Sequence, residues 1–367
     1  MSFFGVTKEE IEEMEEHPNA DRLEICRLKN LSFSFVVEKG LHFVGEKVLY
    51  FPIDSLLPFE LMDKMGFVRD KIVNKEVVKD KNGNPIREGI LSGPNHNRVK
   101  TIKLRGIISQ GIIGPLSLID KLDEGSNFTE FLGVEKYEPE PIVEENCELR
   151  RLPEEISVLY GISGYDIEGA DYHPEIIDIL MDEKVYVTEK VEGKQISITY
   201  RKDTDEFFVN QRNYTIIPTN GKENNTFWKT ALSLDLFDKM KRLLNFNSIT
   251  FFGELLGPGI QKNIYKFKNH NIAFYDIFAD GKFIDANKKY SIFESIGLKY
   301  NIVPILFYGY LEDYLKEKTI QELSNGISEW QDTLREGIVI TPETEKENNQ
   351  IGRLIIKQRS PEYLAKE

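Results

Sequence analysis

The chain has 367 residues, of which 40% are hydrophobic, and a net charge of −14. These values are typical of a soluble globular protein large enough for two domains. No apolar run approaches the roughly 18 residues of a membrane-spanning helix, and the start MSFFGVTKEE lacks the pattern of a signal peptide. Cys26 and Cys147 are the only cysteines, which excludes a disulfide framework and a cysteine-rich zinc site. We therefore expect an intracellular protein.

The negative charge argues against a surface that coats nucleic acid without specificity, but it leaves room for a local basic strip. Much of the acidity is concentrated in two stretches, residues 9–16 and residues 135–155. Net charge is therefore a weak guide to the partner of this protein.

Residues 1–134 favour a compact β-rich module. Short apolar runs alternate with turn residues at Leu23–Leu28, Ser34–Val37, Lys47–Phe51, Val99–Leu104 and Ile107–Ile113. Several short strands at this spacing are typical of a small β-barrel rather than a helical bundle.

One basic strip, NRVKTIKLRG, stands out in this module. It contains four cations and no acid: Arg98, Lys100, Lys103 and Arg105. On a regular strand the first two share one face and the last two share the other, so a bulge is needed before all four meet one ligand. Two interpretations remain open, a charged edge strand that resists aggregation and a site that contacts nucleic-acid phosphates.

Residues 135–155 combine many glutamates with Pro139, Pro141 and Pro153. This composition predicts an acidic, proline-containing linker between residues 1–134 and a second domain at 156–367.

The second domain has an α+β pattern. We expect strands around Val185–Val187, Ile196–Tyr200, Phe207–Val209, Ile249–Phe252, Ile272–Phe278, Gly337–Thr341 and Arg353–Lys357. Helices are expected at Glu175–Met181, residues 227–244 and residues 310–333. The pair Asp280-Gly281 suits a tight hairpin turn.

Apolar strands of this domain end repeatedly in an ionisable residue. These residues are Lys190 with Glu192, Arg212, Glu254, Glu336 and Lys357. Alone, the sequence Lys190-Val191-Glu192-Gly193 also fits a solvated turn. Together, the set supplies a nucleophile, carboxylates for a divalent metal and cations for phosphate, held at strand ends where they can meet in one cleft.

The order of these segments resembles the covalent nucleotidyltransferase superfamily of ligases and capping enzymes. Lys190-Val-Glu192-Gly193 matches motif I, Gln211-Arg212-Asn213 motif Ia, Phe252-Gly253-Glu254-Leu255 motif III, Tyr275-Asp276-Ile277-Phe278 motif IIIa, Glu336-Gly337-Ile338-Val339 motif IV, and Leu354-Ile355-Ile356-Lys357 motif V. Six motifs in the family's order make a specific signal. Glu192 stands where many relatives have aspartate.

The resemblance narrows to RNA ligases of the family-five type. GPGIQKNIY after motif III is similar to the RNA-ligase version, and HPNADRLEI, GEKVLYFPIDSLLP and VKTIKLRGIISQGIIGPL resemble the OB-type module that precedes the catalytic domain there. DNA ligases and capping enzymes carry their OB domain after the catalytic domain, whereas only ten residues follow Lys357 here. The implied fold is α+β, an N-terminal OB-type β-barrel followed by a nucleotidyltransferase domain of packed antiparallel sheets with helices.

The resemblance implies an ATP-dependent RNA ligase that seals 3′-hydroxyl/5′-phosphate breaks, with nicks in a duplex as the expected substrate. AMP would pass from ATP to Lys190 and then to the RNA 5′-phosphate, with Mg²⁺ or Mn²⁺ bound. RNA is the expected partner, and we expect a monomer.

The resemblance also assigns roles to residues. Lys190 and Lys357 are the expected catalytic residues, and Glu192, Glu254 and Glu336 the expected metal carboxylates. For the nucleotide, Glu189 would accept from the adenine amino group through its main-chain carbonyl, and Phe278 would stack on adenine. Arg212 would contact the ribose or the incoming 5′-phosphate, and Glu336 and Lys357 would also contact the nucleotide. Either Arg353 or Arg359 would assist Lys357.

Two alternatives are kept. One is a DNA ligase or capping-type nucleotidyltransferase, which the domain order disfavours. The other is a non-catalytic protein that binds RNA or tRNA, because HPNADRLEI also resembles the start of tRNA-binding OB modules. The presence of Lys190, Glu254, Glu336 and Lys357 argues against a dead catalytic domain.

Overall fold

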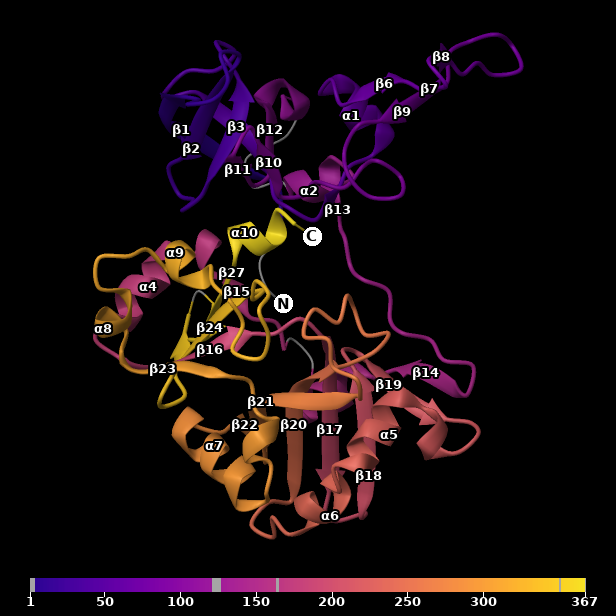
Figure 1. Cartoon of the computed structure of the whole chain (residues 1–367), viewed down its shortest axis with the longest axis vertical. Coiled ribbons are helices and arrows are strands. Elements are labelled where there is room, and N and C mark those ends of the chain that lie inside the picture. Colours follow the sequence, from indigo (N-terminus) through magenta and orange to yellow (C-terminus); the bar gives the residue numbers. More distant parts are fainter. Residues whose placement is uncertain (1–3, 121–126, 163–164, 350, 367) are drawn as a thin grey trace. The chain divides into compact units, whose positions relative to one another are not determined.

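The computed structural model describes residues 4–120, 127–162, 165–349 and 351–366. The chain divides into an N-terminal unit, Phe3–Pro139 with Leu364–Glu367, and a C-terminal unit, Glu140–Tyr363 (Figure 1). No helix in the described ranges is long and apolar enough to cross a membrane. The division at residues 139 and 140 lies inside the segment predicted as a linker.

The N-terminal unit is built on a five-stranded sheet in the order β12-β4-β1-β2-β3. Its strands are β1 (Thr7–Glu16), β2 (Leu23–Leu28), β3 (Ser34–Glu38), β4 (Lys47–Phe51) and β12 (Ile112–Pro115). The segment before β12 forms β11 (Ile107–Ser109), which lies against β3, while β12 pairs with β4 at the other edge. This connection curves the sheet into a half-barrel around buried Leu49 and Phe51.

Strand β1 was not predicted from the sequence, where its glutamates were described only as an acidic stretch. It is 10 residues long and pairs with both β2 and β4. Glu9 and Ile11 on one face are buried, and the Glu9 carboxylate accepts a hydrogen bond from Asn30 at 3.2 Å. Glutamate has a low strand propensity, so the alternation is visible only once the two partner strands are known.

Smaller elements complete the N-terminal unit. They are β5 (Ser55–Leu56), α1 (Phe59–Lys64), β6 (Val68–Asp70), β7 (Ile72–Val73), β8 (Glu76–Val77), β9 (Arg87–Gly89), β10 (Ile102–Leu104), α2 (Phe128–Phe131) and β13 (Glu135–Lys136). Strands β6 to β9 form an arm that projects from the half-barrel (Figure 1). Strand β13, which pairs with β5, comes from the segment predicted as a linker.

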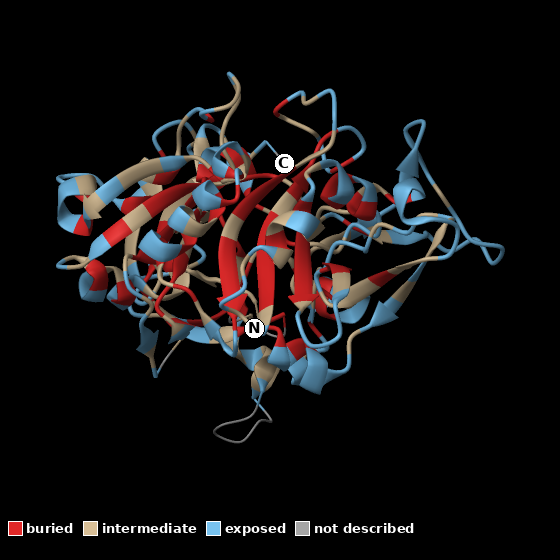
Figure 2. Ribbon diagram, turned by 90° about the horizontal axis from the view of Figure 1, so that it is seen from below, coloured by how far each residue is buried: buried red, intermediate tan, exposed pale blue. Residues whose placement is uncertain are grey.

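The C-terminal unit contains a seven-stranded antiparallel sheet in the order β14-β19-β18-β17-β20-β21-β22. The strands are β14 (Cys147–Arg151), β17 (Lys194–Arg201), β18 (Glu206–Gln211), β19 (Tyr214–Pro218), β20 (Ser248–Leu256), β21 (Asn271–Ala279) and β22 (Lys282–Phe283). Helices α5 (Thr226–Ser233), α6 (Leu236–Lys241) and α7 (Ala286–Ser295) supply side chains to its apolar core. Figure 2 shows the long central strands as buried.

The second sheet of this unit has the order β15-β27-β24-β16-β23. Its strands are β15 (Glu168–Gly169), β16 (Lys184–Lys190), β23 (Ile305–Tyr310), β24 (Gly337–Pro342) and β27 (Ile356–Arg359), and β15 alone pairs in parallel. The remaining elements are α3 (Glu154–Leu159), α4 (Pro174–Leu180), α8 (Leu311–Leu315), α9 (Ile320–Ser324), β25 (Glu347–Asn348), β26 (Gly352–Arg353) and α10 (Pro361–Leu364).

Two helix predictions were too long. The helix expected at residues 227–244 is divided into α5 and α6 at Asp235, whose φ of 51° is left-handed. The helix expected at 310–333 is replaced by β23's last residue, α8, α9 and loops. Apolar spacing near 3.6 persisted through these breaks, so periodicity alone did not locate them.

The motif I segment is not a solvated turn. Strand β16 ends at Lys190 in one sheet and β17 begins at Lys194 in the other, so the segment crosses between sheets. Val191 and Glu192 are only 3% and 7% exposed.

A buried ion network holds the end of β21. Asp276 is fully buried and accepts hydrogen bonds from Arg353 at 2.9 Å, Tyr165 at 2.9 Å and Lys289 at 3.3 Å. Burial alone would raise the pKa of Asp276, but the charges of Arg353 and Lys289 bring it below its ordinary value.

Asp276→Asn is therefore expected to cost about 3–5 kcal/mol of unfolding free energy, because the buried Lys289 loses its counter-charge and Arg353 keeps only its pairing with Glu345. Urea unfolding measures this loss, and the exposed Asp238→Asn on α6 is the control, with an expected change within about 0.5 kcal/mol. Because folding lowers the pKa of Asp276, its contribution is present above about pH 4 and is lost as pH falls further. Equal stability of the two variants at pH 7 would contradict the network's role.

Candidate active site

A cavity of about 180 Å³ lies in the C-terminal unit and takes its walls from both sheets. The five-stranded sheet contributes Thr188, Lys190, Val339, Thr341 and Lys357, and the seven-stranded sheet contributes Gln195, Glu254 and Tyr275. Tyr165, Asp166 and Tyr290 complete much of the lining. Residues from five of the six predicted motifs therefore meet in one cavity.

Strand register explains why one wall carries the lysines. Val339 on β24 lies opposite both Thr188 on β16 and Lys357 on β27, so these side chains share one face. The alternate residues, including Val187 and Ile340, belong to the apolar core on the other face. The sheet thus has one face toward the cavity and one toward the core.

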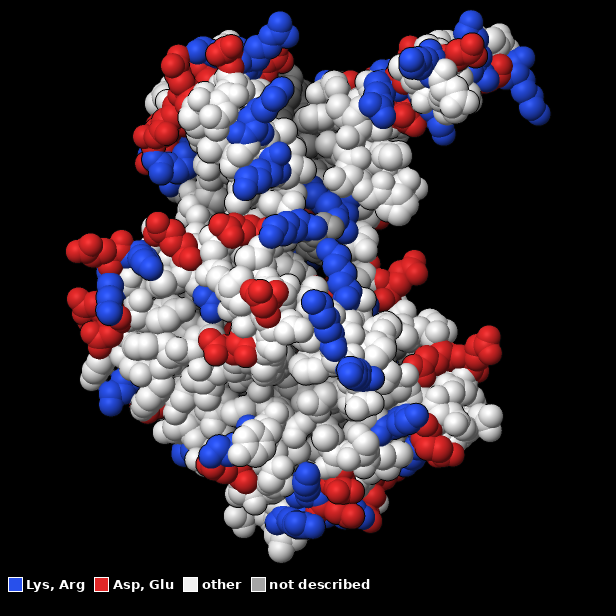
Figure 3. Space-filling model, viewed as in Figure 1, with Lys and Arg blue, Asp and Glu red and all other residues white. Residues whose placement is uncertain are grey.

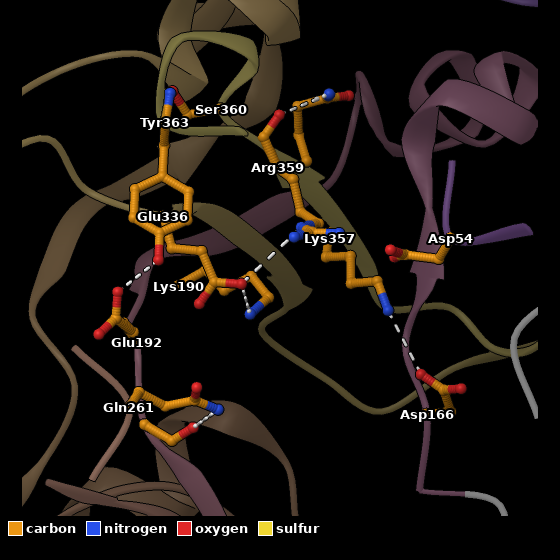
Figure 4. Close-up of polar contacts among 12 residues, drawn as sticks. Asp54, Asp166, Lys190, Glu192, Gln261, Glu336, Lys357, Arg359, Ser360 and Tyr363 are labelled. Atoms are coloured by element: carbon orange, nitrogen blue, oxygen red, sulfur yellow. Dashed lines mark hydrogen bonds and ion pairs between the residues drawn. The ribbon is translucent and has the colours of Figure 1, made fainter. Parts of the chain in front are cut away.

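Lys190 and Glu336 lie at neighbouring strand ends and point toward one another (Figure 4). The Lys190 Nζ donates to the Glu336 Oε1 at 2.5 Å. Gly337 allows β24 to lie close to β27 next to this pair, because a Cβ there would lie 2.1 Å from the carbonyl oxygen of Gln358 on β27. The Nε of Arg359 is 3.8 Å from the same Glu336 oxygen.

Lys357 lies in the same wall of the cavity. Burial lowers its pKa, Asp166 opposes that shift, and the positive charges of Lys190 and Arg359 add to it. The Lys357 Nζ is 3.3 Å from the Asp166 Oδ1. Asp166 was missed by sequence reasoning, because it ends no apolar strand and belongs to none of the motifs.

Glu254 faces the lysines from the opposite sheet. Burial raises its pKa to about 8; Lys190 and Lys194 oppose that rise and the Glu336 carboxylate adds to it. Its Oε2 is buried and has no hydrogen-bond partner among the described residues. A buried carboxylate oxygen of this kind fits a divalent cation. Glu336 is a second acid close enough to raise the pKa of Glu254.

Glu192 is held differently from the prediction. Its Oε1 accepts from the backbone N–H of Lys262 at 2.8 Å, and its Oε2 accepts from the hydroxyl of Tyr363. It does not line the cavity. No group of three or more His, Cys, Asp and Glu side chains within the described ranges is arranged as a metal site. Glu192 would have to give up these bonds to contact a metal directly.

Phe278 also lies away from the predicted place. Its ring packs with Tyr160, Ile162 and Phe252, and a Cβ on Gly161 would lie 2.6 Å from it. The aromatic residue of β21 that lines the cavity is Tyr275. A bulge between Phe252 and Gly253 shifts the register of β20 against β21, and sequence alternation could not reveal that shift.

The two candidate helpers of Lys357 are now distinguished. Arg353 pairs with Asp276 and Glu345, and its guanidinium lies 3.4 Å from the centre of the Phe283 ring. Arg359 lies beside Glu336 and influences Lys357. Geometry therefore favours Arg359 over Arg353.

Of the two remaining nucleotide-binding predictions, Glu189 lines the cavity and Arg212 does not. The main chain of Glu189 is part of β16, while its buried side chain accepts from the backbone N–H of Glu329 at 3.0 Å. Arg212 has a left-handed φ of 50° in the exposed turn between β18 and β19 and does not line the cavity.

The basic strip of the N-terminal unit is divided. Arg98 is tied to Asp54 at 2.5 Å and lies 3.6 Å from the centre of the Tyr137 ring, so it supports the fold rather than facing solvent. Lys103 and Arg105 are exposed on the β10–β11 hairpin, and Lys100 is half-buried. His17 Nε2 and Asn19 Nδ2 contact the carbonyls of Leu104 and Arg105 at 3.1 and 3.2 Å, which anchors that hairpin.

Comparisons with known proteins agree with this architecture. The RNA ligase family model matches residues 183–359, and an OB-fold domain model matches residues 5–116. A search of curated proteins gave no match. The predicted fold class, an OB-fold half-barrel followed by a ligase domain of antiparallel sheets with helices, is confirmed.

Solved structures of Naegleria gruberi RNA ligase share this fold along the whole chain. The structure with PPi is 23% identical with a TM-score of 0.74, and the match covers 99% of this chain and 98% of that one. A variant with ATP and Mn is 24% identical with a TM-score of 0.73 and the same coverage. A variant with AMP and Mn is 22% identical with a TM-score of 0.74, again with coverage of 99% and 98%.

The raised pKa of Glu254 predicts that the unfolding free energy depends on pH. Because the folded carboxyl binds its proton up to about pH 8 whereas an unfolded one releases it near pH 4.3, unfolding free energy should fall as pH rises between these values. Glu254→Gln should remove this fall and so raise the melting temperature at pH 8 more than at pH 5. The exposed Glu155→Gln is the control, and an equal effect of both variants at the two pH values would contradict the shift.

Proposed function

We propose that this chain, whose residues 183–359 match the RNA ligase family model and whose residues 5–116 match an OB-fold domain model, is an RNA ligase that uses ATP to join a 3′-hydroxyl to a 5′-phosphate. The observation that carries the proposal is the meeting of Lys190, Glu254 and Lys357 on one cavity, with Glu336 bonded to Lys190. Convergence of these residues argues against a non-catalytic binding protein.

In the first step the Lys190 Nζ attacks the α-phosphorus of ATP. An N–P bond forms, the bond to the bridging oxygen breaks, and pyrophosphate leaves. The attacking amine must first lose a proton, and the Glu336 carboxylate is already its hydrogen-bond acceptor. Lys357, on the same sheet face, stabilises the charge that develops on the α-phosphate.

In the second step an oxygen of the RNA 5′-phosphate attacks the same phosphorus and the P–N bond breaks, which returns Lys190. In the third step the 3′-hydroxyl oxygen attacks the 5′-phosphate phosphorus and AMP leaves. During these three steps Arg359 adds its positive charge to that of Lys357. Arg212, at its exposed turn, contacts the ribose or the incoming 5′-phosphate.

A divalent cation, Mg²⁺ or Mn²⁺, supplies charge neutralisation for phosphoryl transfer when bound. Glu254 and Glu336 would hold it, since Glu254 has a buried oxygen without a protein partner. Five of the similar Naegleria gruberi structures contain Mn. Glu192, through its hydrogen bonds to Lys262 and Tyr363, holds the segment that passes from one sheet to the other.

Adenine would lie against Tyr275, which takes the place that the sequence analysis gave to Phe278, with the Glu189 main-chain carbonyl accepting from the amino group. For the substrate, we propose a nick in an RNA-containing duplex, bound by a monomeric intracellular enzyme. Lys100, Lys103 and Arg105 would contact its phosphates. The OB-fold domain supports an RNA-binding role, because such domains commonly bind oligonucleotides.

The first step is tested by labelling. Wild-type protein, incubated with ATP labelled at the α-phosphate and a divalent metal, should carry the label through a denaturing gel. Lys190→Ala should show no label above background, whereas Lys229→Ala, on the exposed side of α5, should label like wild type. Labelling that survives loss of Lys190, or labelling from GTP instead of ATP, would overturn the proposal.

The substrate is tested with nicked duplexes that differ only in the sugar of the 3′-hydroxyl strand. We expect sealing with RNA on that side and little with DNA, measured as gel-resolved joined product. Preference for an all-DNA nick would support the DNA ligase alternative instead.

The proposed stacking of adenine on Tyr275 is tested by measuring how the rate of Lys190 labelling depends on ATP concentration. Tyr275→Ala should raise KM for ATP about tenfold to a hundredfold, because stacking on a base contributes about 1–3 kcal/mol, and Tyr275→Phe should restore it. Phe278→Leu should lower the melting temperature and leave KM near wild type. The opposite pattern would return adenine stacking to Phe278.

A further inference from the structure

Residues 68–90, the arm, form a branched β structure that the proposed function does not use. Its stem is the pairing of β6 with β9, and β7 with β8 makes one hairpin. A second hairpin is closed by a bridge between Lys79 and Pro85. The arm projects from the half-barrel in Figure 1.

Backbone hydrogen bonds join the three segments where the arm branches. The N–H of Lys71 donates to the carbonyl of Ile86 at 2.7 Å, that of Ile86 to Val78 at 2.8 Å, and that of Val78 to Lys71 at 2.8 Å. Both tips are also fixed. Asn74 and Lys75 adopt left-handed φ values of 53° and 69° at one tip. At the other, Asp80 accepts from the backbone of Asn82 and Asn84 at 2.8 and 2.9 Å.

Positive charge is concentrated beyond the stem. In the stem, Arg69 pairs with Glu88 at 3.3 Å and Arg87 pairs with Asp63 at 2.5 Å. Beyond it lie four exposed lysines: Lys71, Lys75, Lys79 and Lys81. None of the four forms an ion pair with any residue in the described ranges. The arm carries six basic and four acidic residues in a chain of net charge −14, so its sign is opposite to that of the whole protein.

The arm also exposes aliphatic side chains beside these lysines. Ile72 is 59% exposed, Val73 50%, Val77 41% and Ile86 40%. Figure 3 shows the arm with Lys and Arg side chains along it. A narrow ribbon with lysines around an apolar strip suits the wide, shallow minor groove of an RNA duplex, where phosphates flank sugars and base edges.

We propose that the arm binds the RNA substrate along its duplex, with Lys71, Lys75, Lys79 and Lys81 on phosphates and the aliphatic side chains over the minor groove. This inference rests on the proposed function and deepens it, because it adds an RNA contact separate from the catalytic cavity. The arm supplies affinity for duplex RNA and takes no part in the transfer of AMP to Lys190.

The experiment compares two fourfold variants of the full chain. In the arm variant Lys71, Lys75, Lys79 and Lys81 become Gln. In the control variant four exposed lysines elsewhere, Lys29, Lys229, Lys316 and Lys318, become Gln, which gives the same net charge. Binding to a fluorescent nicked RNA duplex is measured by anisotropy at several salt concentrations.

The arm variant should bind about tenfold to a hundredfold more weakly at low salt. The slope of log K against log[salt] should be smaller in magnitude by about 3.6, since each of the four phosphate contacts contributes about 0.9. The control variant should stay within about threefold of wild type. Equal weakening in both variants, or none in either, would overturn the proposal and would show a non-specific charge effect or another partner for the arm.

Two further measurements keep the outcomes distinct. Labelling of Lys190 from ATP should be equal in all three proteins. If wild type does not label, the proposed function is wrong. The binding measurements still test whether the arm contacts RNA. A second variant replaces residues 71–86 by Asn-Gly, which is feasible because Asp70 and Arg87 lie directly opposite in the stem. Unchanged RNA affinity in this variant would also overturn the proposal.

Discussion

The register across β16, β24 and β27 is the constraint on which the candidate site depends. It aligns Thr188, Val339 and Lys357 on one face and brings Lys190 beside Glu336 at the strand ends. Gly337 permits the close approach of β24 to β27, because any Cβ would meet the carbonyl of Gln358. A slip of one residue would turn both lysines into the apolar core, so the packing of that core also maintains the site.

The opposite wall sets the charge of the cavity. At neutral pH, Glu254 keeps its proton because burial outweighs the attraction of Lys190 and Lys194. On this cavity Lys190 is bonded to Glu336, and Lys357 lies beside Asp166. A neutral Glu254 removes one repulsive charge from the path of an incoming triphosphate. Its proton is also the charge that a divalent cation replaces.

Sequence analysis predicted the elements whose signal is local. Lys190, Glu254 and Lys357 were found because each follows a run of apolar residues in the sequence. Of the three, only Lys190 ends its strand, whereas Glu254 and Lys357 lie within β20 and β27. Asp166 gave no such signal, since it lies outside regular structure. Tyr275 was missed because a bulge, which only the partner strand defines, moves the aromatic position along β21.

Arg98 shows the same limit for charge patterns. It shares a short basic stretch with Lys103 and Arg105, yet its role is decided by Asp54, 44 residues earlier, and by the ring of Tyr137. The arm gives the converse case, because its arginines are neutralised by Glu88 and Asp63 while its lysines are not. Which cations remain available to a phosphate therefore depends on tertiary pairing, and composition cannot supply that information. In this acidic chain, the lysines that tertiary structure leaves in solvent are the better guide to an anionic partner than the net charge.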